Sequence, residues 1–251
     1  DIPLASTSRI EKNPELVEAL KKVLPASSLI EDKAETLAYE CDALTAYRCP
    51  PMLVVLPETT AQVSEVLKLC HKMNIPVIPR GSGTSLAGGA MPSADSVVLG
   101  VSKMNSVLET DYRNRFIRVQ SGLTNIGVTN AVEDNGYFYA PDPSSQLACA
   151  IAGNIGMNSG GAHCLKYGVT SNNLLGVKLV TMDGQILEIG GAAFDSNGLD
   201  LLSVVCGSEG QLGIVTEATL RILHKPEGAL PVLIGFNLSL IHISEPTRPS
   251  S

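Results

Sequence analysis

The sequence predicts an α+β fold of two lobes, in which a small parallel strand–helix–strand lobe is followed by an antiparallel sheet with flanking helices. Three observations predict this fold. Apolar runs of strand length alternate with a helical apolar pattern over residues 52–101, which is typical of a parallel unit. Asp183-Gly184 separates two further runs, as in a β-hairpin, and residues 214–222 alternate apolar and polar side chains, as in a half-buried strand.

The first helix is predicted to begin at Asn13-Pro14-Glu15. Asparagine caps helices, proline suits the first helical position, and an acidic side chain is favourable near the positive end of the helix dipole. The apolar face of this helix is formed by side chains at helical spacing: Leu16, Val17, Leu20, Val23 and Leu24.

The parallel lobe is predicted from three apolar runs, residues 52–56, 77–78 and 96–101, each of which reads as a buried strand. Between the first two runs, Thr59 and Gln62 have the spacing of a capping box. The helix that they begin has apolar side chains at Val63, Val66, Leu67 and Cys70.

The second lobe begins with a predicted strand at residues 116–119 and a predicted helix at residues 124–135. Gly136 is expected to end that helix in the left-handed conformation. Residues 177–181 and 185–189 are expected to pair as the hairpin around Asp183-Gly184.

Composition excludes some classes of function. The chain has 251 residues, 44% of them hydrophobic, and a net charge of -7 without any stretch rich in Lys and Arg. A nucleic-acid partner is therefore not expected, since neutralising phosphates needs a basic face. No apolar run approaches the roughly 20 residues that span a bilayer, and no signal peptide opens the chain, so we expect no transmembrane segment.

The six cysteines are scattered and form no C-x-x-C pair. We expect structural roles for them and a reducing compartment. His163-Cys164 has half the donors of a metal site, but no second pair accompanies it, so no metal is expected.

The segment with the most chemical information is residues 79–89, Pro-Arg-Gly-Ser-Gly-Thr-Ser-Leu-Ala-Gly-Gly, directly after a predicted strand. Its glycines allow positive φ, and successive N–H groups in such a turn form a concave anion site suited to a pyrophosphate. It is not a P-loop, because no Gly-Lys-Ser/Thr follows the first glycine at the required distance. It is not the Rossmann fingerprint either, because Leu86 stands where the third glycine belongs. Taken alone, an ordinary glycine-rich turn explains this segment equally well.

Two more segments rich in small residues favour the binding site. They are residues 141–161, which contain Pro-Asp-Pro-Ser-Ser and Gly-Asn-Ile-Gly-Met-Asn-Ser-Gly-Gly, and residues 207–216, Gly-Ser-Glu-Gly-Gln-Leu-Gly-Ile-Val-Thr. Three such segments, each beside a strand or helix, indicate a long ligand lying against backbone.

Together these motifs, with Lys166-Tyr167-Gly168, resemble the FAD domain of the vanillyl-alcohol-oxidase, or PCMH-type, flavoprotein family. Within that family, residues 39–48 and residues 142–168 resemble the FAD-linked subunit of glycolate oxidases. The resemblance covers residues 9–237 and implies a PCMH-type two-lobed FAD-binding domain.

The resemblance implies a role for particular residues. The pyrophosphate would be held by the first loop, which comprises Arg80, Gly81, Ser82, Gly83, Thr84, Ser85 and Leu86. The flavin and ribityl chain would lie along Pro141, Gly153, Asn154 and Asn158. The site would be closed by Tyr167, Gly168, Glu209, Gly210, Gly213 and Ile214. Thr84 stands where covalent relatives have a histidine, so the FAD is expected to be non-covalent.

The implied reaction is oxidation of glycolate, or a similar 2-hydroxy acid, to the 2-oxo acid. Electrons would pass from the flavin to other glycolate oxidase subunits, including an iron–sulfur protein, in the cytoplasm or peripherally at the inner membrane. The substrate clamp and base would belong to a C-terminal domain, so no catalytic residue is assigned. His71 and His224 are interpreted as structural, because a lone histidine after an apolar helix or strand is usually so.

Alternatives remain open at this point. D-lactate or D-2-hydroxyglutarate would suit the same family, and so would a flavin-dependent reductase of the cell-wall nucleotide pathway, although residues 39–48 argue against that reductase. A non-catalytic flavin-binding fragment is a further possibility.

The chain is expected to divide into four parts: a helical segment (1–48), the FAD-binding domain (49–227), the start of a truncated substrate domain (228–237) and a tail (238–251). The tail resembles the in-frame translation of a transposase sequencing adapter, so we expect it not to be native sequence. The competing interpretation is an edge strand at residues 238–243.

Overall fold

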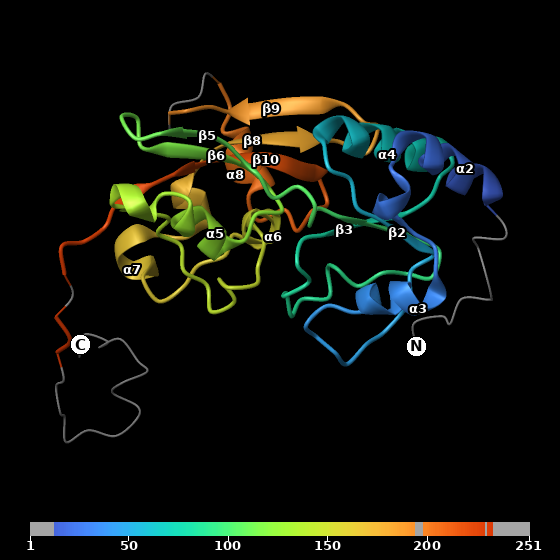
Figure 1. Ribbon diagram of the computed structural model, residues 1–251, viewed down its shortest axis with the longest axis horizontal. Helices are drawn as coiled ribbons and strands as arrows, with labels where there is room; N and C mark the ends of the chain where they lie inside the picture. Colours follow the sequence, from blue (N-terminus) through green and yellow to red (C-terminus); the bar gives the residue numbers. More distant parts are fainter. Residues whose placement is uncertain (1–12, 194–197, 229, 233–251) are drawn as a thin grey trace, which may run out of the picture.

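The computed structural model describes residues 13–193, 198–228 and 230–232. They form two lobes that lie side by side, each a sheet with helices packed on it (Figure 1). The expected α+β fold with a parallel first sheet and an antiparallel second sheet is confirmed. The tail expected at 238–251, and most of the segment expected at 228–237, lie outside the described residues.

The sheet of the first lobe has the strand order β1-β2-β4-β3. Its strands are β1 (Leu29–Ile30), β2 (Leu53–Val55), β3 (Val77–Arg80) and β4 (Val97–Gly100). Both β2 and β3 pair with β4 in parallel, as the apolar runs predicted. The short β1 adds to β2 antiparallel and was not predicted, because two residues carry no periodic pattern.

Helices cover both faces of this first sheet (Figure 1). On one face lie α2 (Pro14–Val23) and α4 (Thr60–Lys72), and below the other lies the short α3 (Lys33–Thr36). The buried side chains Leu16, Leu20 and Leu67 pack with β2 and β4 into one core. The segment before residue 49 is therefore an integral part of the first lobe.

The start of α4 differs in one detail from the predicted capping box. The hydroxyl of Thr59 accepts a hydrogen bond from Gln62 N at 3.2 Å, as expected. The Gln62 amide oxygen, however, accepts from Glu58 N at 2.7 Å rather than from the N–H of the cap residue. Each contact gives a hydrogen-bond acceptor to a backbone N–H at or just before the start of α4 that has no partner within the helix.

The second lobe contains a five-stranded antiparallel sheet of order β5-β6-β10-β8-β9. Its strands are β5 (Val107–Asp111), β6 (Phe116–Gln120), β8 (Leu174–Val180), β9 (Ile186–Gly190) and β10 (Ile214–Arg221). The predicted hairpin is confirmed: β8 and β9 pair around a turn in which Gly184 has φ +81°. The edge strand β5 was not predicted.

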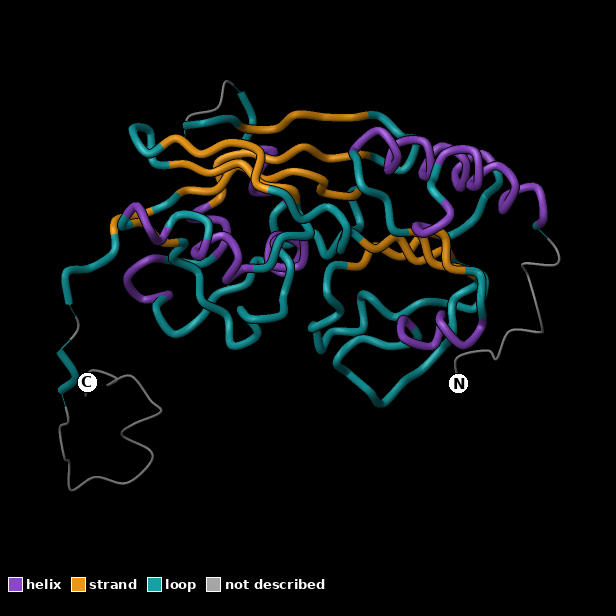
Figure 2. Tube along the Cα trace, viewed as in Figure 1, coloured by secondary structure: helices purple, strands orange, loops and turns teal. Residues whose placement is uncertain are grey.

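Helices α5 (Asn125–Asn130), α6 (Ile151–Met157), α7 (Cys164–Tyr167) and α8 (Leu201–Val205) lie under this sheet (Figures 1 and 2). The helix predicted over residues 124–135 is wrong in length. It stops at Asn130, and a separate 3-10 turn (Glu133–Asn135) leads to Gly136, whose φ is +77°. Gly127, Val128 and Thr129 are weak helix formers, so little favours a longer helix.

Three 3-10 turns and a small sheet complete the described fold. The turns are Ala26–Ser28, Leu37–Tyr39 and Thr170–Asn173, and β7 (Tyr137–Phe138) pairs with β11 (Leu223–His224). The His224 ring lies 4.3 Å from the Tyr137 ring, which agrees with a structural role.

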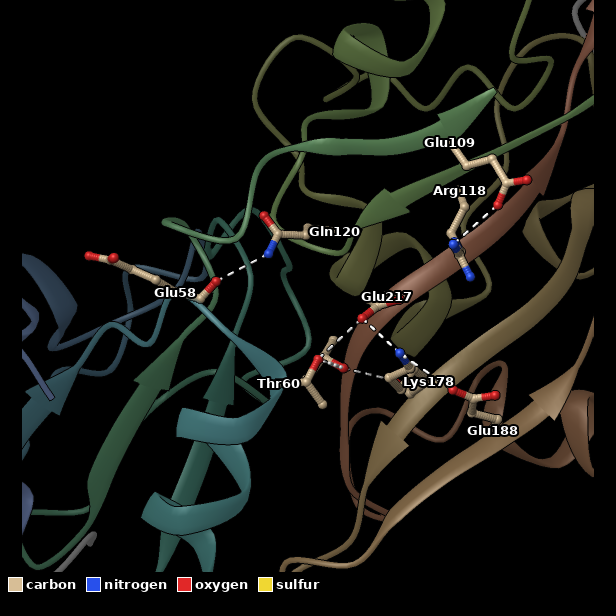
Figure 3. Close-up of polar contacts among 9 residues, drawn as sticks. Glu58, Thr60, Glu109, Arg118, Gln120, Lys178, Glu188 and Glu217 are labelled. Carbon is tan, nitrogen blue, oxygen red and sulfur yellow. Dashed lines mark hydrogen bonds and ion pairs between the residues drawn. The ribbon is translucent and has the colours of Figure 1, made fainter. Parts of the chain in front are cut away.

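The two lobes are joined by a seam of polar contacts at the N-terminal end of α4 (Figure 3). Thr60 donates to the hydroxyl of Thr216 on β10, and the Gln120 amide donates to the Glu58 carbonyl at 3.1 Å. Deeper in the seam, the buried hydroxyl of Ser64 donates to Gly184 O at 2.6 Å. Because buried polar groups need partners, these contacts fix how the lobes sit against each other.

Within the described residues, every helix is too short or too polar to cross a membrane. All six cysteines are free thiols, and no group of three or more His, Cys, Asp or Glu side chains in the described part is arranged to hold a metal.

Candidate cofactor site

A cavity of about 350 Å³ lies where the loops of the two lobes meet. Its walls come from three segments: residues 79–90 after β3, residues 149–159 around α6, and residues 205–215 before and within β10. These are the three segments rich in small residues that the sequence singled out.

The first wall presents unused backbone donors. Within the described residues, no atom accepts a hydrogen bond from the N–H groups of residues 82–85. Gly83 has φ +71°, a conformation that glycine adopts without strain. A run of free N–H groups in a tight loop is an anion-binding concavity.

A half-buried cation supports this loop. Arg80 Nη1 donates to Cys41 O at 2.8 Å and to Ala90 O at 3.4 Å, and the guanidinium lies 5.5 Å from the centre of the Tyr39 ring. Burial lowers the pKa of Arg80 below its usual value, although nearby groups, Asp42 among them, offset part of that effect. An arginine stays charged in proteins, and no carboxylate of the described residues is within ion-pair distance of it. Its charge therefore favours an anion at the loop.

The second wall brings backbone close to the ligand space. A side-chain carbon at Gly81 would lie 3.4 Å from Gly153 N, so the loop and α6 are nearly in contact. A side-chain carbon at Gly153 would meet nothing within 4 Å and would project into open space. Glycine at position 153 thus leaves space in the cavity that a larger side chain would fill.

Asn154 contributes an unsatisfied donor. It lines the cavity and is 1% exposed, and its Nδ2 atom has no hydrogen-bond partner among the described residues. An orphaned buried donor costs about 1–3 kcal/mol, and a ligand acceptor would remove that cost.

The third wall is tied to the end of α6. Gly207 N donates to Ile155 O and Glu209 N donates to Gly156 O, both at 2.8 Å. Glu209 has φ +54°, an uncommon conformation for a residue with a side chain, and Gly210 follows with φ +78°. A side-chain carbon at Gly210 would lie 2.6 Å from Pro79 Cγ, so glycine lets the first and third walls approach each other.

The arrangement fits a flavin dinucleotide. The free N–H groups and the half-buried arginine suit a pyrophosphate, and the apolar lining, with Val101, Ile155 and Val205, suits flat rings.

Most of the residues assigned from the sequence line this cavity. They are Arg80, Gly81, Ser82, Gly83, Thr84, Ser85, Leu86, Gly153, Asn154, Glu209, Gly210, Gly213 and Ile214. Ala152, next to Gly153 in the chain, also lines it.

Four assigned residues do not line the cavity, and they make structural contacts instead. Pro141 O accepts from the buried Asn125 side chain, and Asn158 Oδ1 accepts from Ser171 N. Tyr167 packs edge-on against Phe138, and Gly168 ends α7 with φ +73°. Their roles at the cofactor stay predictions.

Some lining residues were not assigned from the sequence. Six of them lie within the segments recognised, namely Ser145, Cys149, Gly156, Met157, Ser159 and Ser208. Val101 and Val205 lie outside those segments and carry no local pattern that points to a site. Outside the cavity lining, His163 Nδ1 lies 2.5 Å from Asp142 Oδ2.

Comparison with known families decides the class of this site. The FAD binding domain family matches residues 51–190, more than half of the chain. The chain belongs to this family of FAD-binding domains. Its cofactor is FAD, and the cavity lies between residues of the matched region and the loop that follows it.

Curated relatives of this FAD-binding domain are hydroxy-acid enzymes. The chain is 45% identical over 219 residues to glycolate oxidase subunit GlcD of Escherichia coli K12, covering 87% of this chain and 44% of that protein. It is 42% identical over 211 residues to GlcD of Bacillus subtilis, and 33% identical over 225 residues to D-lactate dehydrogenase of Anaerostipes hadrus. The chain therefore spans somewhat less than half the length of these relatives, with 44–47% of each covered.

A solved structure confirms the PCMH-type fold of the domain. Alkyldihydroxyacetonephosphate synthase superposes on 91% of this chain with a TM-score of 0.80 and 25% identity, and the match covers 43% of that protein.

Proposed function

We propose that this chain is the FAD-binding part of an oxidoreductase that oxidises glycolate, or a similar 2-hydroxy acid, to the 2-oxo acid. The observation that carries the proposal is the 45% identity to the glycolate oxidase subunit over 87% of this chain. The next relatives named for another substrate, D-lactate and D-2-hydroxyglutarate dehydrogenases, are 33% and 34% identical.

In this proposal the chain binds and orients the cofactor. The N–H groups of residues 82–85 hold the pyrophosphate, and Asn154 Nδ2 donates to an acceptor on the dinucleotide. FAD supplies the acceptor for the hydride that leaves the Cα of the acid. The α6 wall and the 205–215 segment exclude water from the cavity, which strengthens the electrostatic contacts inside it.

The substrate clamp and the base that takes the hydroxyl proton are assigned to the region of the longer relatives that this chain does not cover. Electron transfer from the flavin to other subunits, including an iron–sulfur protein, belongs to the same proposal. So does a cytoplasmic location, with attachment to the inner membrane through those subunits.

The test uses the full reading frame that contains this chain, purified with its flavin. Turnover is measured with glycolate, D-lactate and D-2-hydroxyglutarate and a dye that accepts electrons. We expect the highest kcat/KM for glycolate. A preference for D-lactate or D-2-hydroxyglutarate would support the second candidate, and flavin-loaded protein without turnover of any acid would disprove the proposed reaction.

A further inference from the structure

The segment of residues 39–44 lies outside the region that the family matches, yet it is bonded to the glycine-rich loop of the cofactor site. It leads from α3 toward β2 and packs on the face of the first sheet opposite α4, where the Tyr39 ring contacts Val54 and Val98. Two of its backbone groups hold the loop: Ala43 N donates to Ser85 O at 3.1 Å, and Cys41 O accepts from Arg80.

A buried carboxyl group makes the third contact between this segment and the loop. Asp42 is 4% exposed, and each of its oxygens accepts one hydrogen bond from a backbone N–H. Oδ1 accepts from Leu44 N at 2.9 Å within the segment, and Oδ2 accepts from Gly88 N at 2.8 Å across to the loop. Burying a carboxyl group is costly, and here both oxygens are paired with donors that no other described atom takes up.

These bonds divide the loop into two halves. The N–H groups of residues 82–85 are unused, whereas those of Ala87 and Gly88 are taken by the Ser85 hydroxyl and by Asp42. Gly88 has φ +80°, and two hydrogen bonds hold its backbone: its N–H donates to Asp42, and its carbonyl accepts from Met91 N at 3.1 Å. Fixing the second half of the loop leaves the first half preorganised for its ligand, which reduces the ordering cost of binding.

We propose that Asp42 is a positioning residue for the pyrophosphate of FAD, acting through Gly88 and the Gly83-containing loop without touching the cofactor. This proposal rests on FAD binding at the cavity and is independent of which acid is oxidised. Arg80 complements it, because its half-buried cation donates to Cys41 O of the segment and offsets part of the Asp42 charge.

The test compares ligands that do and do not carry a pyrophosphate. Dissociation constants for FAD, ADP and riboflavin are measured on the purified chain by flavin fluorescence and calorimetry, for wild type and for Asp42→Asn. The amide keeps one acceptor and offers an N–H₂ group to the other donor, so either Leu44 N or Gly88 N loses its bond. We expect FAD and ADP to bind at least about tenfold more weakly and riboflavin to bind within about twofold of wild type.

The matched control is Asp32→Asn. Asp32 Oδ1 accepts from Ala34 N and Glu35 N at the start of α3, so the same substitution removes a carboxylate charge from a backbone-capping position away from the loop, where the single amide oxygen keeps both bonds. It should leave all three affinities unchanged. A loss of riboflavin affinity equal to that of ADP in Asp42→Asn, or unchanged FAD and ADP affinities, would overturn the proposal.

A second variant covers the case in which Asp42→Asn does not fold. Ala43→Pro removes the N–H that bonds Ser85 O without altering a buried side chain, and the same selective loss of FAD and ADP is expected. Ala43→Pro with wild-type affinities would overturn the proposal. If the wild-type chain binds neither FAD nor ADP, FAD binding at the cavity is itself disproved. A failure of the proposed function is therefore distinguishable from a failure of the Asp42 proposal.

Discussion

The hydroxyl of Thr60, in the first turn of α4, donates a hydrogen bond to the hydroxyl of Thr216 on β10 at 3.0 Å (Figure 3). Thr216 is fully buried, and its own hydroxyl donates a hydrogen bond to Lys178 O at 3.2 Å. This contact joins a helix of the first lobe to the central strand of the second. The cavity for FAD is built from both lobes, so the seam that fixes their relative position also fixes the cavity.

We predict that Thr216→Val lowers the free energy of unfolding, because it removes contacts in the seam. Valine has the same shape but removes the acceptor for Thr60 and the donor to Lys178 O. We expect a loss of about 1–3 kcal/mol in the free energy of unfolding, measured by urea denaturation. Thr219→Val on the same strand is the control, since Thr219 is half-buried on the outer face and its hydroxyl bonds to no described residue. Equal costs for the two variants would contradict a role for the seam.

Gly83→Ala should abolish detectable FAD binding. The methyl group would overlap the Arg80 guanidinium and would hold alanine at φ +71°. Gly136→Ala imposes a similar φ of +77° with nothing within 4 Å of the new carbon, far from the cavity lining. That variant should lose about 1 kcal/mol of stability and keep its FAD. Flavin absorbance of the purified variants distinguishes the two, and a yellow Gly83→Ala protein would rule out the assigned loop.

Gly153→Leu should change stability and binding in opposite directions. Residue 153 lies inside α6, where replacing glycine by a helix former gains up to about 1 kcal/mol, but the new side chain projects into the cavity. We expect a higher thermal midpoint for the apoprotein and loss of FAD binding. Gly153→Ala should gain the same stability with a smaller loss of affinity. A leucine variant that binds FAD as wild type does would show that the ligand lies elsewhere.

Asn154→Leu should weaken FAD binding by about tenfold without destabilising the apoprotein, because it removes a buried donor that has no partner. The comparison is Asn125→Leu, at a residue equally buried whose amide donates to Pro141 O at 3.0 Å. There the same change should destabilise the fold. Calorimetric unfolding with and without FAD measures both effects, and a stability loss in Asn154→Leu like that in Asn125→Leu would argue against a ligand acceptor.

Acid precipitation of flavin-loaded protein should release all the flavin into the supernatant. Thr84 lines the cavity at the position where covalent relatives carry a histidine, and its hydroxyl is no comparable nucleophile. Absorbance of supernatant and pellet decides this. Flavin retained in a washed pellet would disprove the interpretation of position 84.

Local patterns predicted those parts of the molecule that depend on local chemistry. The strands at β2, β3, β4 and β10, the β8–β9 turn at Gly184 and the three cavity walls all follow from apolar periodicity or from glycines at tight backbone positions. The resemblance to the PCMH-type flavoprotein family then indicated FAD as the ligand. The two-residue β1 was missed because it is too short to carry a pattern, and β5 was missed because its exposed and half-buried residues do not alternate in polarity.

The other features that the sequence did not predict depend on contacts between residues far apart in the chain. Asp42 accepts a hydrogen bond from Gly88, 46 positions later in the chain, and the sequence around Asp42 does not indicate that partner. Asn154 and Asn158 look alike in sequence, yet one lines the cavity with an unpaired amide and the other accepts from Ser171 N. Such differences arise from packing between segments, which a single sequence does not display.

The order of the three cavity walls along the chain has a consequence for biosynthesis. The first wall, residues 79–90, and the segment that bonds it emerge from the ribosome early, with nearly all of the first core. Val180 and Ile214 of the second lobe complete that core, and the third wall closes at residue 215. Nascent chains that end before residue 215 present an open cradle, so stable uptake of FAD has to wait until the third wall has been translated. Flavin supply would then act on a polypeptide that already contains both lobes rather than on the emerging first lobe.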